Sequence, residues 1–183
     1  MDALLATHRR LLEARRHAMN LVGPGDLEPH YLDARRGLAG LHPVGLWADL
    51  GSGAGFPGIV FAAMFPEVAV HLIERRQKRA VFLEAVLIEA RDLVAARPAP
   101  IEVQRVDLTA LSPGTYDGVL ARALAPAAEV LTIAWPLLKP GGQAVLFIQG
   151  DAREPHVDGY ARVAVHPYRV EGRAHKTVSW RKI

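Results

Sequence analysis

Ten residues in the first third of the chain have the composition of a nucleotide-type ligand loop. Asp49 to Gly58 read Asp-Leu-Gly-Ser-Gly-Ala-Gly-Phe-Pro-Gly, and they separate two apolar runs, residues 44–50 and 59–65. Glycines let the backbone turn sharply and approach a ligand that a Cβ would push away. The N-terminus of a following helix would aim its free N–H groups at a ligand above the strand. The segment therefore predicts a strand, a ligand-binding turn and a helix.

The glycine spacing alone does not identify the ligand. Gly53, Gly55 and Gly58 fit the dinucleotide pattern G-x-G-x-x-G, and Glu74 lies near the distance expected for a ribose-binding carboxylate. Asp49 distinguishes a dinucleotide from other ligands, because a carboxylate at the strand end would repel the negatively charged pyrophosphate of a dinucleotide. It suits a ligand with cationic groups and no phosphate, such as S-adenosylmethionine (SAM). The alternative is a glycine-rich turn that binds no ligand.

The composition is that of a folded protein. Of 183 residues, 50% are apolar and 22% are charged, so the chain can form one domain with a sizeable core. There is no cysteine, which excludes disulfides and thiolate metal sites. No apolar stretch approaches the length of a membrane span, and paired arginines interrupt the apolar residues at the N-terminus. We expect a cytoplasmic protein that requires neither a membrane nor a metal.

Basic residues gather near both ends of the chain, although the net charge is only +3. Residues 160–183 contain six arginines or lysines and one acid, Glu171, while residues 8–17 contain four arginines and two histidines. Such patches can follow the phosphate backbone of a nucleic acid. An arginine-rich surface that only keeps the protein in solution is the alternative, and the sequence leaves both open.

The apolar periodicity alternates between strand-like and helix-like segments. We expect helices at residues 3–18, 28–41, 57–65, 76–94 and 126–138, and strands at 44–50, 68–74, 101–106, 116–121 and 143–149. This alternation predicts a parallel sheet covered on both faces. Residues 162–170 and 175–182 alternate polar and apolar around Glu171-Gly172-Arg173, as an antiparallel hairpin does. The predicted fold is α/β, a class I SAM-dependent methyltransferase (Rossmann-like) three-layer sandwich. Its sheet is mostly parallel and seven-stranded, with an antiparallel C-terminal hairpin.

Ligands of such sheets bind outside the carboxyl ends of the strands, so residues at those ends are candidates for the site. Glu74 ends the second strand and could accept bonds from two ribose hydroxyls, or it could be an acid at a helix start. Asp107 follows the third strand and could accept from an adenine amino group, or cap a short turn. Arg122 ends the fourth strand and could pair with a ligand carboxylate, or with a structural acid such as Asp49.

Four segments of the chain resemble one family, the bacterial 16S ribosomal RNA guanine-N7 methyltransferases called RsmG or glucose-inhibited division protein B. The segments are Asn20-Leu21-Val22 with His30-Tyr31-Leu32-Asp33, Asp49 to Gly58, Glu74 to Lys78 with Phe82-Leu83, and Ala121-Arg122-Ala123. The Phe-Pro-Gly ending of the second segment is far more specific than its glycines. The resemblance covers most of the chain, from about residue 14 to the last strand.

This resemblance implies SAM-dependent methylation of N7 of a guanine in small-subunit (16S) ribosomal RNA. It implies that Gly51 and Phe56 contact the cofactor, that Val106 and Asp107 hold the adenine edge, and that Glu74 occupies the ribose position. With the residues at the strand ends, the expected cofactor-binding set is Asp49, Gly51, Gly53, Gly55, Phe56, Glu74, Val106, Asp107 and Arg122.

Three polar residues are the candidates for orienting the target base: Arg122, Asn20 and His30. Guanine N7 carries an in-plane lone pair, so the transfer needs no general base, and catalysis rests on aligning N7 with the methyl group. Because a cation near the sulfonium would oppose it, we expect Arg122 to be paired. Asn20 could equally form a loop hydrogen bond, and His30 could be a structural partner of Asp33.

The expected organisation is a single methyltransferase domain over residues 1–183, on which a helical N-terminal extension, residues 1–42, is packed. Its expected partner is 16S ribosomal RNA or the small ribosomal subunit, and it is expected to be a monomer. Trp47, Trp135 and Trp180 are expected in packing positions. Gln149 stands where the family usually has lysine. This leaves open a class I methyltransferase acting on another RNA or a small molecule, or a non-catalytic SAM-binding module associated with RNA.

Overall fold

A seven-stranded sheet forms the centre of the protein, whose residues 2–183 are described by a computed structural model. The strands are β1 (Leu46–Leu50), β2 (Ala69–Ile73), β3 (Ile101–Gln104), β4 (Tyr116–Arg122), β5 (Leu138–Gln149), β6 (Tyr160–Val170) and β7 (Arg173–Lys182). Their order is β3-β2-β1-β4-β5-β7-β6. Strands β1 to β5 pair in parallel, and β7 lies antiparallel between β5 and β6. The predicted mostly parallel sheet with an antiparallel C-terminal hairpin is confirmed.

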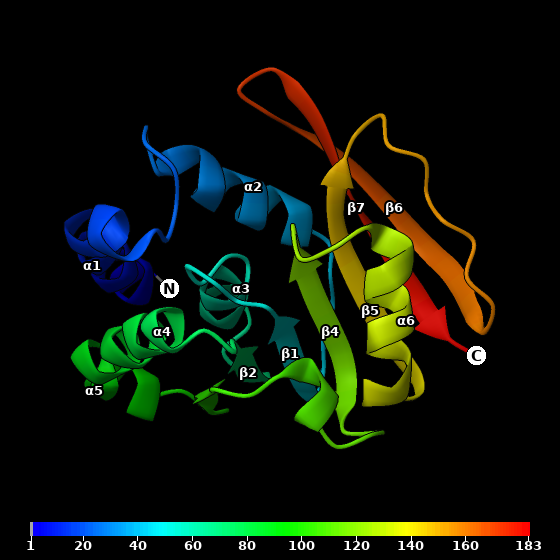
Figure 1. The fold of residues 1–183 in the computed structure, drawn as a ribbon, viewed down its shortest axis with the longest axis horizontal. Helices are drawn as coiled ribbons and strands as arrows, with labels where there is room; N and C mark the ends of the chain where they lie inside the picture. The colour runs from blue at the N-terminus through cyan, green and yellow to red at the C-terminus, as the bar shows by residue number, and fades with distance from the viewer. Residues whose placement is uncertain (1) are drawn as a thin grey trace.

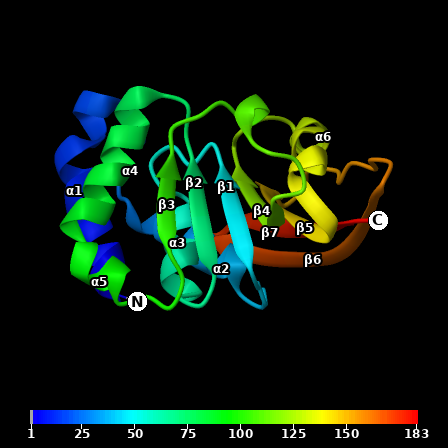
Figure 2. The ribbon, with the colours of Figure 1, turned by 90° about the horizontal axis from the view of Figure 1, so that it is seen from below.

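Helices cover both faces of this sheet. They are α1 (Asp2–Met19), α2 (Glu28–Leu38), α3 (Gly58–Met64), α4 (Gln77–Glu89), α5 (Arg91–Ala95) and α6 (Ala127–Leu137), with a 3-10 turn, η1, at Leu108–Ala110. Both ribbon views place α1 beside α4, whereas α6 lies apart from them over β4 and β5 (Figures 1 and 2). Within residues 2–183, none of the helices combines the length and apolar character needed to cross a bilayer.

Alternate residues of the strands supply two apolar clusters, one on each face of the sheet. In β1, Trp47 belongs to the cluster under α1 to α4, whereas Ala48 and Leu50 belong to the cluster under α6. Side chains alternate across a strand, so a strand covered on both faces needs a continuous apolar run. Trp47 and Trp180 are both 2% exposed, which confirms that they are core residues. Trp135 is partly buried with its ring edge-on to Tyr160, also in a packing position.

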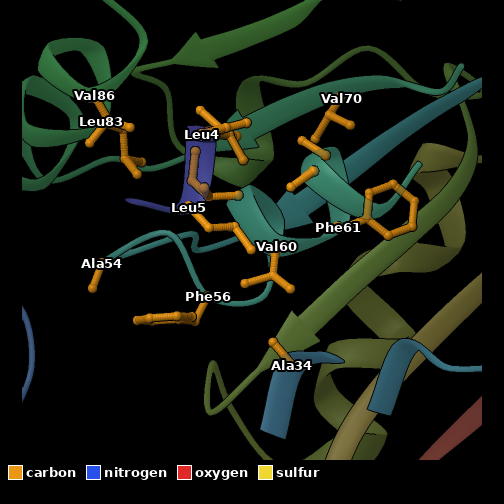
Figure 3. Packing of buried hydrophobic residues seen from close by; sticks show 14 of the residues in the cluster. Leu4, Leu5, Ala34, Ala54, Phe56, Val60, Phe61, Val70, Leu83 and Val86 are labelled. Carbon is orange, nitrogen blue, oxygen red and sulfur yellow. The ribbon is translucent and has the colours of Figure 1, made fainter. Parts of the chain in front are cut away.

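The two N-terminal helices complete the first of these clusters. α1 packs against α3 and α4, and α2 packs against α3 and the hairpin strands. In Figure 3, Leu4 and Leu5 of α1 lie beside α3, and they share one cluster with Val60 of α3 and Ala34 of α2. Both helices therefore lie on the same face of the sheet as α3. This packing places α1 and α2 next to the glycine loop.

Several boundaries differ from the sequence-based expectation. The helix expected at residues 76–94 is divided at Ala90, whose backbone leaves the helical region with φ −97° and ψ 18°. Pro57 and Pro126 precede α3 and α6 as caps rather than occupying the first helical position. The strand expected from residue 143 begins earlier, at Leu138, and contains Pro140-Gly141-Gly142, because Leu138 already pairs with Tyr116 of β4 ahead of an irregularity in the register.

Candidate functional site

A cavity of about 650 Å³ opens at the carboxyl ends of the parallel strands. Its walls come from the segments that follow β1, β2, β3 and β4, including Gly51, Glu74, Val106, Asp107, Ala123 and Leu124. β1 lies between β2 and β4, where the chain changes direction across the sheet, and a parallel α/β sheet forms a crevice at such a point. The volume is in the range of small-molecule sites.

Gly51 lies in this cavity with a left-handed backbone, φ 73°. A Cβ at this position would lie 2.8 Å from Cδ1 of Leu124, which forms the opposite wall. Both the backbone conformation and the close approach therefore require glycine here. Gly53 and Gly55 also have positive φ, but they lie outside the cavity wall and shape the loop instead.

Glu74 has its carboxylate fixed in the cavity wall by two backbone N–H groups. Gly53 N donates to Oε2 at 3.1 Å and Arg76 N donates to Oε1 at 2.7 Å, and the residue is 5% exposed. Each carboxylate oxygen has a second acceptor position. The group is therefore held rigidly and can still accept bonds from two adjacent hydroxyls.

Asp107 forms the turn cap that was one of the two roles expected for it from the sequence. It caps η1, because Oδ1 accepts from Thr109 N at 3.1 Å and from Thr109 Oγ1 at 2.9 Å. These bonds hold the pKa of the Asp107 carboxyl below its usual value. Its other oxygen, Oδ2, is 3.5 Å from Nη1 of Arg75. Asp107 and Val106 both line the cavity, so Oδ2 is placed to accept from an amino group there.

Asp49 lies beneath the loop rather than in the cavity wall. It is 1% exposed, and its Oδ2 accepts from the N–H of Gly58 at 3.1 Å. Burial raises the pKa of this carboxyl to about 6. A Cβ at Gly58 would overlap the Asp49 carboxylate, which explains the last glycine of the loop. Asp49 would act on a ligand through its charge and through the shape of the loop, without direct contact.

Arg122 is paired, as expected, but its partner is Asp33 of α2. Its Nη1 lies 2.9 Å from Asp33 Oδ2, and its guanidinium carbon lies 5.1 Å from the centre of the Phe56 ring. The sequence-based alternative of a salt bridge to a structural acid is therefore confirmed, but the acid is Asp33, because Asp49 instead accepts from the N–H of Gly58. Arg122 and Phe56 form a group beside the cavity and are not part of its wall.

Asp33 is the site residue that sequence reasoning did not include. Besides the bond from Arg122, its Oδ1 accepts from the Tyr168 hydroxyl at 2.8 Å and lies 3.4 Å from His175 Nδ1. Burial raises the pKa of the Tyr168 hydroxyl, so it remains a donor. One carboxylate thus joins α2, β4 and both hairpin strands. The signal for it was present in the His-Tyr-Leu-Asp segment.

His30 and Asn20, the other two candidates for the target base, have different surroundings. His30 is half-buried with its ring 5.5 Å from that of Phe56, and burial, together with the charge of Arg122, lowers its pKa. The Asp33 carboxylate bonds to Arg122 and Tyr168 instead, so the structural pairing with His30 that the sequence offered as an alternative is not formed. Asn20 has φ 49° in the turn after α1, and its carbonyl accepts from Arg79 Nη2 at 3.3 Å.

A family model described as "GidB: rRNA small subunit methyltransferase G" matches residues 3–172. A curated relative from Bradyrhizobium sp. (strain ORS 278), named Ribosomal RNA small subunit methyltransferase G, is 34% identical over 167 residues. That alignment covers 86% of this chain and 70% of the relative. Other relatives of the same name are covered by the chain over 60% to 72% of their length.

Two solved structures share the fold at low sequence identity. A SAM-dependent methyltransferase from Aquifex aeolicus has a TM-score of 0.61 at 15% identity, covering 86% of this chain and 94% of that one. A methyltransferase from Pyrococcus furiosus has a TM-score of 0.63 at 13% identity, covering 100% and 99%. These likenesses establish the methyltransferase fold.

Proposed function

The chain belongs to the GidB family of small-subunit rRNA methyltransferases, and from this premise we propose that it transfers a methyl group from SAM to N7 of a guanine in 16S ribosomal RNA. The observation that carries the proposal is the composition of the cavity. Two carboxylates, Glu74 and Asp107, and the glycine-rich turn at Gly51 line one space of suitable volume at the carboxyl ends of four strands. The two carboxylates can accept from the hydroxyl and amino groups of an adenosine.

The residues present fit SAM group by group. Glu74, held by two backbone N–H groups, would accept from the ribose hydroxyls, and Val106 and Asp107 would hold the adenine edge. Gly51 leaves the backbone accessible to the methionine part, because no Cβ stands between it and Leu124. When bound, SAM supplies an electrophilic methyl group on a sulfonium.

The group of Arg122, Phe56 and His30 would orient the target base. His30 has a lowered pKa, so it is neutral near pH 7 and can donate or accept a hydrogen bond. The Asp33 carboxylate offsets the charge of Arg122, which reduces its opposition to a sulfonium nearby. Because N7 needs no deprotonation, these residues would act by holding the base in line with the methyl group.

The direct test is transfer of a radiolabelled methyl group to small ribosomal subunits from cells that lack the endogenous enzyme. We expect label in 16S RNA, mapped to N7 of a single guanine, and no label with the Gly51→Arg variant, whose side chain would fill the cofactor cavity. Naked 16S RNA should be assayed in parallel to identify the form of the substrate. Label in a different RNA would favour the alternative raised by Gln149, and binding of SAM without any transfer would favour a non-catalytic module.

Domain organisation, cellular location and oligomeric state belong to the same proposal. We propose that it works as a cytoplasmic monomer and as one domain, with residues 1–42 as its N-terminal extension. The burial of Leu5, Leu12 and Ala34 in the cluster shared with α3 supports this organisation.

A further inference from the structure

His8 is a buried polar residue on an otherwise apolar face of α1. It is 0% exposed, and the same helix buries Leu4, Leu5, Leu11 and Leu12. Burying a polar ring is unfavourable unless its polar atoms are hydrogen-bonded. A histidine at this position is therefore stable only if its ring nitrogens have hydrogen-bond partners, which a leucine would not need.

Both ring nitrogens of His8 are hydrogen-bonded. Nε2 lies 2.7 Å from the carbonyl oxygen of Ala54, and Nδ1 lies 2.7 Å from the hydroxyl of Tyr31. A carbonyl only accepts, so Nε2 carries the proton and Nδ1 accepts from Tyr31. Burial lowers the pKa of His8 to about 4 and raises that of Tyr31, so both groups keep these protonation states near pH 7.

The imidazole contacts three consecutive residues of the glycine loop. It bonds to Ala54, it lies edge-on to the Phe56 ring at 5.2 Å, and it occupies the space beside Gly55, where a Cβ would lie 2.9 Å from Nε2. Ala54 and Phe56 lie along this loop, close to the first residues of α3 (Figure 3). The Tyr31 ring is also edge-on to Phe56, at 4.8 Å.

The residues on either side of Ala54 serve the two halves of the site. Gly53 donates its N–H to Glu74, which faces the cavity, and Phe56 lies under the guanidinium of Arg122. A shift of the loop would move both groups together. Ala54 lies between Gly53 and Phe56 in the loop, and the side chain of His8 bonds to its carbonyl oxygen.

We propose that His8 is a positioning residue for methyl transfer, which fixes the glycine loop from α1 so that Glu74 and Arg122 are both correctly placed. The inference rests on the proposed function, and it makes the N-terminal helix part of the active structure. Tyr31 extends the same chain of hydrogen bonds to α2, which also carries His30 and Asp33.

The test compares His8→Phe with His8→Gln. Phenylalanine keeps a ring but removes the donor to Ala54, so we expect the dissociation constant for S-adenosylhomocysteine to rise about tenfold and kcat for methyl transfer to fall. Glutamine places an amide N–H where Nε2–H lies, so it should restore the dissociation constant to within about threefold of the native value. Calorimetry measures the affinity, and single-turnover transfer measures the rate.

Leu12→Ala is the matched control, because Leu12 is fully buried on the same helix and has no polar contact with the loop. It should lower Tm but leave the dissociation constant within about twofold below that Tm. A lowered Tm with native affinity and rate in His8→Phe would overturn the inference and make His8 structural. If the native protein itself fails to bind S-adenosylhomocysteine, the proposed function fails instead.

A spectroscopic measurement on the native protein keeps the inference testable if His8→Phe does not fold. Nitrogen-15 spectra should show His8 as the neutral Nε2–H tautomer between pH 5 and 8, and addition of S-adenosylhomocysteine should shift its Nε2 resonance. The Nδ1–H tautomer, or a resonance that does not respond to the ligand, would contradict it.

Discussion

Arg122 and Asp33 are the pair of residues on which the target half of the site depends. Their side chains are 19% and 14% exposed, so neither charge is well solvated. Removing one partner of such a pair leaves the other charge uncompensated. Arg122 also lies against the Phe56 ring, so loss of the pair should change the chemistry as well as the stability of the fold.

Arg122→Ala should reduce kcat for methyl transfer about 100-fold, because the target base would no longer be held in line with the methyl group. Affinity for S-adenosylhomocysteine should change less than about threefold, since Arg122 does not line the cofactor cavity. Asp33→Asn keeps the shape of the partner but removes its charge, and it should lower kcat by a smaller factor. If Arg122→Ala lost activity only to the extent that its lowered Tm explains, Arg122 would be a structural residue.

Asp49 links the stability of the fold to pH. Its pKa in the folded protein is raised by burial from 3.8 to about 6, so the protonated form is favoured by folding. Protonated Asp49 therefore contributes fully to the free energy of unfolding below pH 3.8, and this contribution is lost as the pH rises through 6. At pH 7.5 the buried carboxylate then costs about 3 kcal/mol relative to the protonated group.

Asp49→Asn should therefore be more stable than the native protein at pH 7.5, by about 1–3 kcal/mol, because the amide oxygen can still accept from Gly58. The difference should shrink toward pH 4. The same variant should lose affinity for SAM relative to S-adenosylhomocysteine, if the negative charge favours the sulfonium. Urea unfolding at pH 4 and 7.5 measures the first effect, and a variant that is less stable at both would contradict it.

Among the helices and strands, α2 is the element that links Arg122 to the C-terminal hairpin. It presents Asp33 to Arg122 and rests on the hairpin, where Thr177 Oγ1 donates to the carbonyl of Gly37 at 2.7 Å. Gly37 allows this approach, because a Cβ there would lie 2.9 Å from both Thr177 Cγ2 and the Tyr168 hydroxyl, and would overlap Phe147. The position of the helix thus depends on the missing side chain.

Gly37→Ala should push α2 away from the hairpin and destabilise the protein by about 1–3 kcal/mol. Methyl transfer should fall as Asp33 moves from Arg122, while affinity for S-adenosylhomocysteine should be nearly native. Gly23→Ala is the control, since a Cβ at Gly23 meets nothing within 4 Å. Thermal unfolding and transfer assays compare the two. A Gly37→Ala protein with native stability would show that α2 can shift without cost.

The elements themselves could be predicted from the sequence because each has a local signal. The strand–loop–helix unit at Asp49 to Gly58, the alternating strands and helices, and the C-terminal hairpin all have such patterns, and the structure contains all of them. The start of β5 could not be predicted in this way. Leu138 joins the sheet through pairing with Tyr116, a long-range contact that the proline and two glycines just after it in the sequence do not signal.

The candidate site was predictable in part, for a related reason. The strand-end residues Gly51, Glu74, Val106 and Asp107 share one cavity because parallel strands bring their carboxyl ends together. Asp33 and Arg122 are 89 residues apart, and His8 and Ala54 are 46 apart. No periodicity relates such pairs, so only the packing of α1 and α2 on the sheet reveals them.

At the scale of the whole molecule, several of the cations that the sequence grouped into basic patches are engaged within the protein. Arg9 pairs with Glu13 and Glu28, and Arg162 and Lys176 both pair with Glu154. These contacts favour a structural role for much of the basic clustering at both ends. Contacts to RNA would then depend more on cations at the cavity, where Arg75, Arg76 and Arg79 form part of the wall.

From the residues that line it, we infer that the cavity at the strand ends binds an adenosine-based methyl donor and not a dinucleotide. A crystal structure of the protein grown with both S-adenosylhomocysteine and NAD tests it most directly. The result we predict is S-adenosylhomocysteine in the cavity, with its ribose hydroxyls on Glu74 and its adenine at Val106 and Asp107. Density for NAD instead, with its diphosphate seated over residues 51–58, would contradict the assignment of cofactor and reaction.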